Sequence, residues 1–301
     1  MTDKAISDNY NTDSRVNLLQ GDSLSHLRSL KSESIDLILT SPPYNIGKDY
    51  EKVVPLDQYL ELQTSVLEEC VRVLKPSGNI CWQVGFTKDQ DEIVPLDALF
   101  YPIMKKLGLK LRNRIIWTFG HGMHAQKRFS GRHETILWFA KDLSLSHFNL
   151  EAVRIPQKYP GKRHYRGPKK GEYSGHPMGK NPGDVWDIPN VKSHHVEKTF
   201  HQCQFPIALA QRVIRGLCPI DGVVLDPYSG VATTCCAAAL EGRRSVGIEL
   251  NPDYFEEGKA RVAAALEGKL RYRPLEKPVQ EPNPRDPNVH RRPAEDNNAP
   301  E

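Results

Sequence analysis

Short apolar runs alternate with helical patterns along most of this 301-residue chain, and this alternation limits the folds that it can adopt. The strand-like runs are 16–22, 35–44, 79–85, 111–119, 134–141, 222–230 and 244–250. The segments with apolar residues at helical spacing are 57–74, 96–108, 205–218, 233–242 and 252–268. Such alternation predicts an α/β domain with a mostly parallel sheet and helices on both faces. Because ligands bind beyond the carboxyl ends of the strands in such sheets, we expect functional residues just after the strands.

An irregular segment, residues 142–200, separates the two alternating parts of the chain. It is rich in Pro, Gly, His and Tyr and has no hydrophobic period. Between Arg154 and Thr199, ten Lys and Arg residues face four Asp and Glu residues, a net charge of +6 in a chain whose total is +4. This composition predicts an irregular basic insert that contacts phosphates. A solvated lysine-rich loop is the alternative.

Both ends of the chain are polar. Residues 1–15 have no apolar stretch of the signal-peptide type and are expected to form a polar arm, and residues 271–301 to form a disordered tail. The chain contains no run of about 18 apolar residues, so we expect no membrane span. The six cysteines include no CxxC pair, so we expect no metal site, and free thiols suit a reducing compartment. These features together predict a cytoplasmic protein.

The run 222–230 ends in Asp-Pro-Tyr-Ser-Gly and is typical of a strand that leads into a ligand-binding turn. Glycine has no Cβ, so the backbone at Gly230 can approach a ligand closely. The acid at Asp226 can hold an ammonium or hydroxyl group, and Thr233 and Thr234 then open a helix of small residues. An ordinary strand-turn-helix connection with a capping threonine remains an alternative for this segment alone.

A second acid, Glu249, ends the next strand-like run. An acid about 20 residues after a glycine turn binds ribose hydroxyls in nucleotide-binding folds. The turn lacks the GxGxxG pattern that holds a pyrophosphate, so a dinucleotide is disfavoured. A cofactor with one adenosine and no pyrophosphate fits better, and S-adenosylmethionine (SAM) is such a cofactor.

The most informative hexapeptide is Thr-Ser-Pro-Pro-Tyr-Asn, residues 40–45. Two prolines after an apolar strand fix the backbone and remove two N–H groups. The Ser41 side chain and the Pro42 carbonyl could then accept both hydrogens of an exocyclic amino group and make its nitrogen nucleophilic. Tyr44 could stack on a base rotated out of a duplex. A simple strand-ending turn is the alternative.

In their order along the chain, these motifs resemble those of the DNA amino-methyltransferases, specifically the permuted group whose catalytic half precedes its cofactor half. The resemblance covers about residues 16–270. It implies a Rossmann-like methyltransferase sheet with a catalytic half in 16–141, a target-recognition insert in 142–200 and a SAM-binding half in 201–270. Residues 182–186, Pro-Gly-Asp-Val-Trp, are similar to a stretch near the end of the family's recognition region.

The resemblance and the motifs together give a set of expected site residues. The expected catalytic residues are Ser41, Pro42, Pro43 and Tyr44. The expected cofactor-binding residues are Asp22, His201, Cys203, Phe205, Pro206, Asp226, Pro227, Ser229, Gly230, Thr233, Thr234 and Glu249. The expected DNA-binding residues, chosen where Arg and Lys mix with aromatic residues, are Arg128, Lys162, Arg163, Arg166, Lys169 and Lys170.

The implied reaction is methyl transfer from SAM to an exocyclic amino group of a base in duplex DNA, by base flipping and direct transfer. Serine before the two prolines favours N4 of cytosine, and N6 of adenine stays open as an alternative. No Pro-Cys dipeptide occurs, which argues against C5-cytosine methylation. A non-catalytic DNA-binding protein and an RNA or protein methyltransferase are further alternatives. The sequence leaves open the recognition site, a cognate restriction endonuclease and a homodimer.

Overall fold

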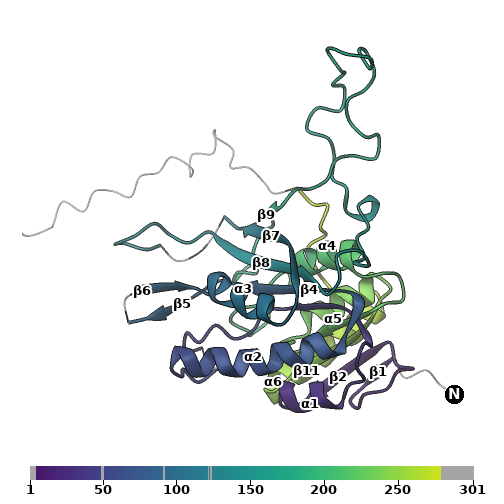
Figure 1. Ribbon diagram of the computed structural model, residues 1–301. Helices are drawn as coiled ribbons and strands as arrows, with labels where there is room; N and C mark the ends of the chain where they lie inside the picture. Colours follow the sequence, from purple (N-terminus) through teal and green to yellow (C-terminus); the bar gives the residue numbers. More distant parts are fainter. Residues whose placement is uncertain (1–4, 49–50, 91, 121, 123, 279–301) are drawn as a thin grey trace, which may run out of the picture.

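The computed structural model describes residues 5–48, 51–90, 92–120, 122 and 124–278. Nine strands form one sheet in the order β1-β2-β11-β10-β3-β4-β8-β7-β9 (Figure 1). Their bounds are Ile6–Ser7 (β1), Val16–Gln20 (β2), Ile35–Thr40 (β3), Leu74–Val84 (β4), Lys110–Thr118 (β7), His133–Ala140 (β8), Val185–Asp187 (β9), Val223–Asp226 (β10) and Arg244–Glu249 (β11). All neighbouring strands pair in parallel except β8, which is antiparallel to both β4 and β7. The expected α/β, mostly parallel sheet is therefore confirmed.

Helices cover both faces of this sheet, as expected. One hydrophobic cluster holds side chains of α4, α5 and α6, and the other holds side chains of α1, α2 and α3. The helix bounds are Ser23–Ser29 (α1), Leu56–Val73 (α2), Leu96–Lys106 (α3), Ile207–Leu217 (α4), Thr233–Leu240 (α5) and Pro252–Leu266 (α6). The stripe of buried residues on α2 includes Tyr59, Gln63, Val66 and Cys70, at the spacing of one helix face.

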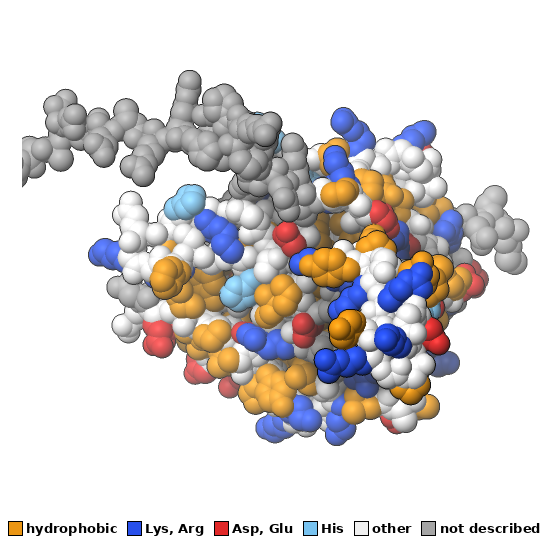
Figure 2. Space-filling model, turned by 90° about the horizontal axis from the view of Figure 1, so that it is seen from above, with side chains coloured by type: hydrophobic (Ala, Val, Ile, Leu, Met, Phe, Trp, Pro, Cys, Tyr) orange, Lys and Arg blue, Asp and Glu red, His pale blue; other side chains and the backbone are white. Residues whose placement is uncertain are grey.

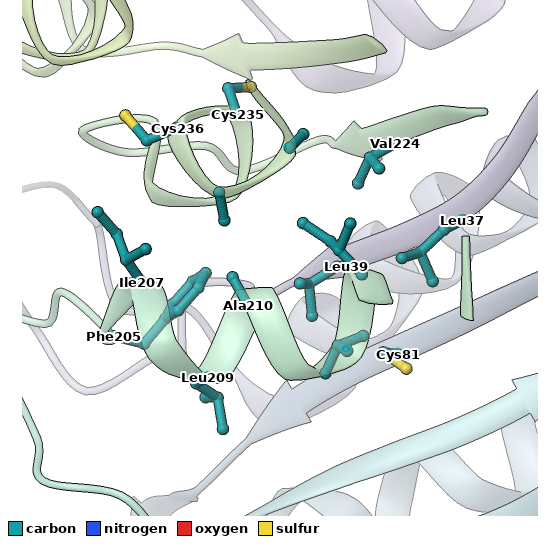
Figure 3. Close-up of a cluster of buried hydrophobic side chains, with 14 of the residues drawn as sticks. Leu37, Leu39, Cys81, Phe205, Ile207, Leu209, Ala210, Val224, Cys235 and Cys236 are labelled. Carbon is teal, nitrogen blue, oxygen red and sulfur yellow. The ribbon is translucent and has the colours of Figure 1, made fainter. Parts of the chain in front are cut away.

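The core around α4 fixes the cofactor half against the catalytic half. Figure 3 shows α4 between the strands that carry Leu39 and Cys81 and the helix that carries Cys235 and Cys236. Small residues such as Ala210 on α4 allow this close approach. The thiols in this core are buried and unpaired with one another, as the sequence suggested. Trp82, Trp117 and Trp138, which lie in strand-like runs of the sequence, are also buried.

The sequence did not predict β1, α1, the short β9, the short 3-10 helix η1 (Glu151–Val153) or the hairpin of β5 (Phe86–Asp89) with β6 (Glu92–Pro95). Each is too short to carry a clear hydrophobic period. Pairing with neighbouring strands decides the short strands, whereas Asp22 caps the start of α1. Part of the expected polar arm thus forms an edge strand, because Ile6 pairs with Val16. Part of the insert likewise pairs, since Trp186 of β9 lies opposite Trp117 of β7.

The start of the expected disordered tail is packed on the domain. The Arg273 amide donates to Glu197 Oε1 at 3.0 Å, and Tyr272 and Leu275 pack against the α4 cluster. Residues 271–278 therefore belong to the ordered part of the chain, and the rest of that expected tail, 279–301, lies outside the described residues. Within the described residues, no helix has the length and apolar composition needed to cross a bilayer.

Candidate active site and nucleic-acid interface

The two main motifs of the sequence lie beside each other at one edge of the sheet. Strands β3 and β10 pair in parallel, with Leu37 opposite Val224, so residues 41–44 and 227–230 both leave the sheet at its carboxyl edge. The Thr40 hydroxyl donates to Asp226 Oδ1 at 2.6 Å and joins the ends of the two strands. A third loop meets them there, because the Ser23 hydroxyl donates to the Pro227 carbonyl at 2.5 Å. The site therefore combines residues that are about two hundred positions apart in the chain.

Asp226 holds the base of this site together. Besides Thr40, the Thr234 hydroxyl donates to its Oδ2 at 2.6 Å, and the Tyr228 amide donates to its Oδ1 at 3.1 Å. The carboxyl is buried, and burial raises its pKa to about 6, while these hydrogen bonds oppose the rise. Its oxygens are thus engaged with the protein. A direct contact between Asp226 and a ligand stays a prediction.

Glu249 lies against the glycine turn from the neighbouring strand. Its Oε2 accepts a hydrogen bond from the Gly230 amide at 2.7 Å, and its Oε1 accepts one from the Asn251 amide at 2.8 Å. Burial raises the pKa of this carboxyl, and the two backbone donors oppose the rise. Each oxygen of a carboxylate can accept more than one hydrogen bond, so Glu249 can also receive two ribose hydroxyls. The geometry fits the expected role.

His201 covers the glycine turn. A Cβ on Gly230, whose φ is +52°, would lie 3.0 Å from His201 Nε2, and the imidazole packs on Tyr254 with ring centroids 4.5 Å apart. The Cys203 amide donates to His201 Nδ1 at 3.2 Å. Burial, with Lys198 and Arg261, lowers the pKa of His201 to about 4, so the ring is neutral near pH 7. Its Nε2–H therefore faces the turn as a donor.

The rest of the segment 201–206 is anchored by hydrogen bonds. The Ile207 amide donates to the buried carboxyl of Glu197 at 2.9 Å, which caps α4, and the Thr199 hydroxyl donates to Gln204 Oε1 at 3.0 Å. Phe205 and Pro206 are buried here, whereas Cys203 is exposed. Phe205 is part of the core cluster, so its expected contact with a cofactor stays a prediction.

The remaining expected cofactor residues have structural contacts of their own. Asp22 caps α1, where it accepts from the Ser25 amide at 2.9 Å, and its side chain lies at the carboxyl edge of β2. The Ser229 amide donates to the Ile248 carbonyl at 2.9 Å. Arg261 donates to the Thr233 hydroxyl at 3.2 Å. Asp22, Glu249 and the 226–230 turn follow three neighbouring strands, so the structure brings the expected adenosine site together.

The loop of the Ser-Pro-Pro-Tyr motif is fixed from both ends. The Tyr59 hydroxyl donates to the Pro43 carbonyl at 2.7 Å. Asn45, at φ +59°, is buried, and its side chain pairs with the Val54 backbone at 2.8 and 2.9 Å. Pro42 is buried and Ser41 is half-buried at the edge of the sheet. This anchoring holds Ser41 and Tyr44 where an incoming base could reach them.

Tyr44 meets a half-buried acid, Glu134, that the sequence did not predict as a site residue. Its hydroxyl lies 3.0 Å from Ser41 Oγ and donates to Glu134 Oε2 at 3.1 Å, and Gln83 Nε2 donates to the same oxygen at 2.6 Å. Burial raises the pKa of Tyr44 well above its usual value, and Glu134 adds to the rise. Ser41, Tyr44, Gln83 and Glu134 form the catalytic-edge cluster.

The expected DNA-binding residues of the insert lie on a protruding arm. Residues 154–180 leave and rejoin the domain where Ile155 pairs with Lys180, and the legs of the arm meet again at Arg163 and Tyr173. Figure 1 shows the arm projecting beyond β9, and Figure 2, which looks down on it, shows many blue Lys and Arg side chains there. Lys162 lies on one leg and is exposed. The side chains at the tip are also exposed: Tyr165, Arg166, Lys169 and Lys170.

Two of the expected DNA-binding arginines stack on aromatic rings of the protein itself. The Arg163 guanidinium lies 4.1 Å from the centroid of the Tyr173 ring and donates to the Gly171 carbonyl at 2.5 Å. Arg128 lies in the loop between β7 and β8 and stacks 5.5 Å from the Phe86 ring. Next to it, Phe129 is 99% exposed, an unusual position for a phenylalanine. This loop leaves the sheet at the same edge as the catalytic-edge cluster, because Glu134 follows it directly.

The residues that the structure describes contain no group of three or more His, Cys, Asp and Glu side chains that could hold a metal ion. A mostly parallel sheet with acids at the ends of neighbouring strands, an adjacent Ser-Pro-Pro-Tyr loop and a basic arm is the arrangement expected of one class of protein, the nucleic-acid methyltransferases that act on amino groups. Comparison with known proteins agrees. The family described as DNA methylase, of the N6 and N4 type, matches residues 35–260. This chain belongs to that family.

Its curated relatives include several DNA methyltransferases that match most of this chain. The chain is 46% identical to the type II methyltransferase M.BglII of Bacillus subtilis over 240 residues, which are 79% of this chain and 66% of that protein. It is 38% identical to the type II methyltransferase M.ScaI of Streptomyces caespitosus over 87% of this chain and 86% of that protein. It is 31% identical to the DNA adenine methyltransferase YhdJ of Escherichia coli K12 over 82% of this chain and 83% of that protein.

Two solved structures share the fold. TTHA0409 of Thermus thermophilus, a candidate DNA modification methylase solved with S-adenosyl-L-methionine, has a TM-score of 0.58 and 28% identity, over 83% of this chain and 96% of its own. The cytosine-N4-specific PvuII DNA methyltransferase has a TM-score of 0.64 at 20% identity, over 88% of this chain and 96% of its own. The expected methyltransferase family and fold are confirmed, and the chain is a DNA methyltransferase.

Proposed function

We propose that this chain transfers the methyl group of SAM to the exocyclic N4 of a cytosine in a specific site of duplex DNA. One observation carries the proposal: the hydrogen bond from Thr40 to Asp226 joins the Ser-Pro-Pro-Tyr strand to the glycine-turn strand at one edge. A methyl donor held by residues 226–230 can therefore face a base held by residues 41–44. If these loops opened on opposite edges, no transfer could occur.

The methyl donor is SAM, and the residues at the edge fit its parts. Glu249 can receive ribose hydroxyls, Asp22 at the carboxyl edge of β2 can accept from an adenine amino group, and the neutral His201 can donate toward the methionine end. The relative TTHA0409 is solved with this molecule. When bound, SAM supplies an electrophilic methyl group on a sulfonium. The protein positions this group and stabilises developing charge, which accounts for most of such catalysis.

The chain's own residues act on the base. Ser41 Oγ and the Pro42 carbonyl would accept the two amino hydrogens and so localise the nitrogen lone pair, and the Tyr44 ring would support the extruded base. The anchoring of Asn45 and Pro43 keeps this loop fixed, so little ordering free energy is lost on binding. Lys and Arg residues on the arm at 154–180 would neutralise phosphates of the duplex.

Cytosine N4 is the proposed target because serine stands before the two prolines at Ser41. Adenine N6 is the second candidate, since both bases present the same amino group beside a ring nitrogen and YhdJ is a DNA adenine methyltransferase. A partnership with a restriction endonuclease of the same specificity is proposed from the type II relatives. We expect the protein to methylate its DNA substrate in the cytoplasm.

The deciding experiment uses unmethylated plasmid and genomic DNA with methyl-labelled SAM. After digestion to nucleosides, label in N4-methylcytosine would support the proposal, and label in N6-methyladenine would move the target to adenine. DNA binding with neither SAM binding nor label in DNA would favour the non-catalytic DNA-binding alternative. Sequencing of the methylated DNA would then give the recognition site for all further assays.

A further inference from the structure

A chain of hydrogen bonds leads from the proposed catalytic serine into the protein. Ser41 Oγ lies 3.0 Å from Tyr44 Oη, and Tyr44 Oη donates to Glu134 Oε2 at 3.1 Å. Gln83 Nε2 also donates to Oε2, at 2.6 Å, and fixes the carboxylate. Three elements thus meet here: the loop after β3, the end of β4 and the start of β8. This series of hydrogen bonds ends at the Glu134 carboxylate, which Gln83 holds in a defined position.

The direction of these hydrogen bonds follows from the protons available. Tyr44 has one hydroxyl proton and gives it to Glu134, so its oxygen can only accept from Ser41. Ser41 then gives its own proton to Tyr44, which leaves the Ser41 oxygen as an acceptor toward a ligand. The amino group of the base needs such an acceptor for one of its hydrogens. If Glu134 were protonated, the direction could reverse and Ser41 would become a donor.

We propose that Glu134 is the final acceptor of the proton that the base amino group loses during methyl transfer, with Tyr44 and Ser41 as the relay. The inference rests on the proposed function above. As the nitrogen–methyl bond forms from the nitrogen lone pair, the sulfur–methyl bond of the donor breaks and its electron pair stays on sulfur, which leaves as a neutral thioether. The N–H bond also breaks, and its electron pair stays on nitrogen. That proton passes to Ser41 Oγ, the Ser41 proton passes to Tyr44 Oη, and the Tyr44 proton passes to Glu134 Oε2. One positive charge on the methyl donor and one negative charge on Glu134 are lost together, so the net charge is unchanged.

The charges around Glu134 suit a proton acceptor. Burial raises the pKa of its carboxyl, whereas the hydrogen bonds from Gln83 and Tyr44 and the nearby His133 and Lys192 lower it, with a net rise. An acid with a raised pKa binds a proton more readily than an ordinary glutamate, and general bases are most effective when their pKa lies near the working pH. The acceptor must be ionised to work. The rate of methyl transfer should therefore fall as the pH falls through the pKa of Glu134.

The test is the single-turnover rate of methyl transfer to the duplex as a function of pH, with saturating SAM and DNA. Glu134→Gln keeps the shape and an acceptor oxygen for Tyr44 but cannot take the proton. We expect a loss of about 100-fold, the lower range for a general base, and loss of the acidic limb of the profile. Tyr44→Phe, which keeps the ring, should give a similar loss. The double variant should lose little more, because both changes interrupt one relay.

Matched controls separate this role from a structural one. Glu61→Gln changes an exposed acid on α2 and should leave both the rate and the profile unchanged. SAM affinity and melting temperature of Glu134→Gln should stay close to those of the wild-type protein. A rate within twofold of wild type, or an unchanged acidic limb, would overturn the relay. Absence of methylation by the wild-type protein would instead overturn the proposed function.

Discussion

The Nε2 atom of His201 lies 3.0 Å from the point where a side chain at Gly230 would place its Cβ. Nine in ten Cβ contacts in proteins are looser than this, and Gly230 has a φ of +52°, a region that favours glycine. The turn and the histidine thus fit together only because residue 230 lacks a side chain. This pair closes the proposed methionine end of the cofactor site.

Gly230→Ala is expected to weaken SAM binding at least 10-fold, because the new methyl group pushes His201 away from the turn. The backbone strain should also lower the free energy of unfolding by roughly 1 kcal/mol. The matched control is Gly242→Ala, since Gly242 has a φ of +71° but nothing within 4 Å of an added Cβ. It should share the stability loss and keep SAM affinity. Isothermal titration with SAM and denaturant unfolding measure both, and equal SAM affinities in the two variants would contradict the assignment.

Ser41→Ala is expected to lower the single-turnover rate by about 100-fold or more, the range seen when one polar group that stabilises a transition state is removed. Ser41 lies at the edge of the adenosine-type site, so SAM affinity should stay near normal. Ser65→Ala on α2, whose hydroxyl only bonds the Glu61 carbonyl at 3.2 Å, serves as a control. A wild-type rate for Ser41→Ala would reject the catalytic role.

The pKa of Asp226 leads to a prediction about stability. Burial raises this pKa from 3.8 to about 6, so between these pH values the folded protein binds more protons than the unfolded chain. Stability contributed by this group therefore falls as the pH rises from about 4 to 6, by up to about 3 kcal/mol. Asp226→Asn removes the titration. Unfolding free energies of both proteins at pH 4 to 7.5 should converge or cross in that window, and a constant difference between them would refute the raised pKa.

Local motifs were predictable because each one follows its own strand. The sequence alone indicated 41–44 and 226–230, since the prolines, the glycine and the preceding apolar runs are neighbours in the chain. Their meeting at one edge follows from the parallel pairing of β3 with β10. In contrast, Glu134 stands at the beginning of a strand. It reaches the same edge only because β8 runs antiparallel to its neighbours, a reversal that no local pattern in the sequence reveals.

The arm at 154–180 illustrates the second limit of the sequence. Charge and aromatic content correctly pointed to an irregular basic segment, but they could not separate residues that build the arm from residues that project from it. Arg163 bonds the Gly171 carbonyl and stacks on Tyr173, whereas Arg166, Lys169 and Lys170 are exposed at the tip. From the sequence alone, all of these residues are expected to contact DNA in the same way. Residues that build the arm can be told from residues that project from it only once the pairing of its two legs is known.

Residues at the tip of the arm and the residue that holds its legs together should affect DNA binding in different ways. The triple variant Arg166→Ala, Lys169→Ala and Lys170→Ala removes three exposed charges at the tip of the arm that can neutralise phosphates. DNA affinity should fall, and the slope of log affinity against log salt should decrease by about 3, near 0.9 for each lost phosphate contact. SAM affinity should not change. Arg163→Ala should loosen the arm and also weaken DNA binding, with a slope change of about 1 or less, because its loss acts through the Tyr173 stack.

The control for the triple variant must remove the same charge from another edge. Lys105→Ala, Lys106→Ala and Lys110→Ala achieve this, because these lysines lie at the end of α3 and the start of β7, away from the carboxyl edge of the sheet. If nonspecific charge alone attracts DNA, both triple variants should lose affinity equally, and the arm would have no special role. If the arm contacts the duplex, fluorescence anisotropy at several salt concentrations should show the slope change only in the variant at its tip.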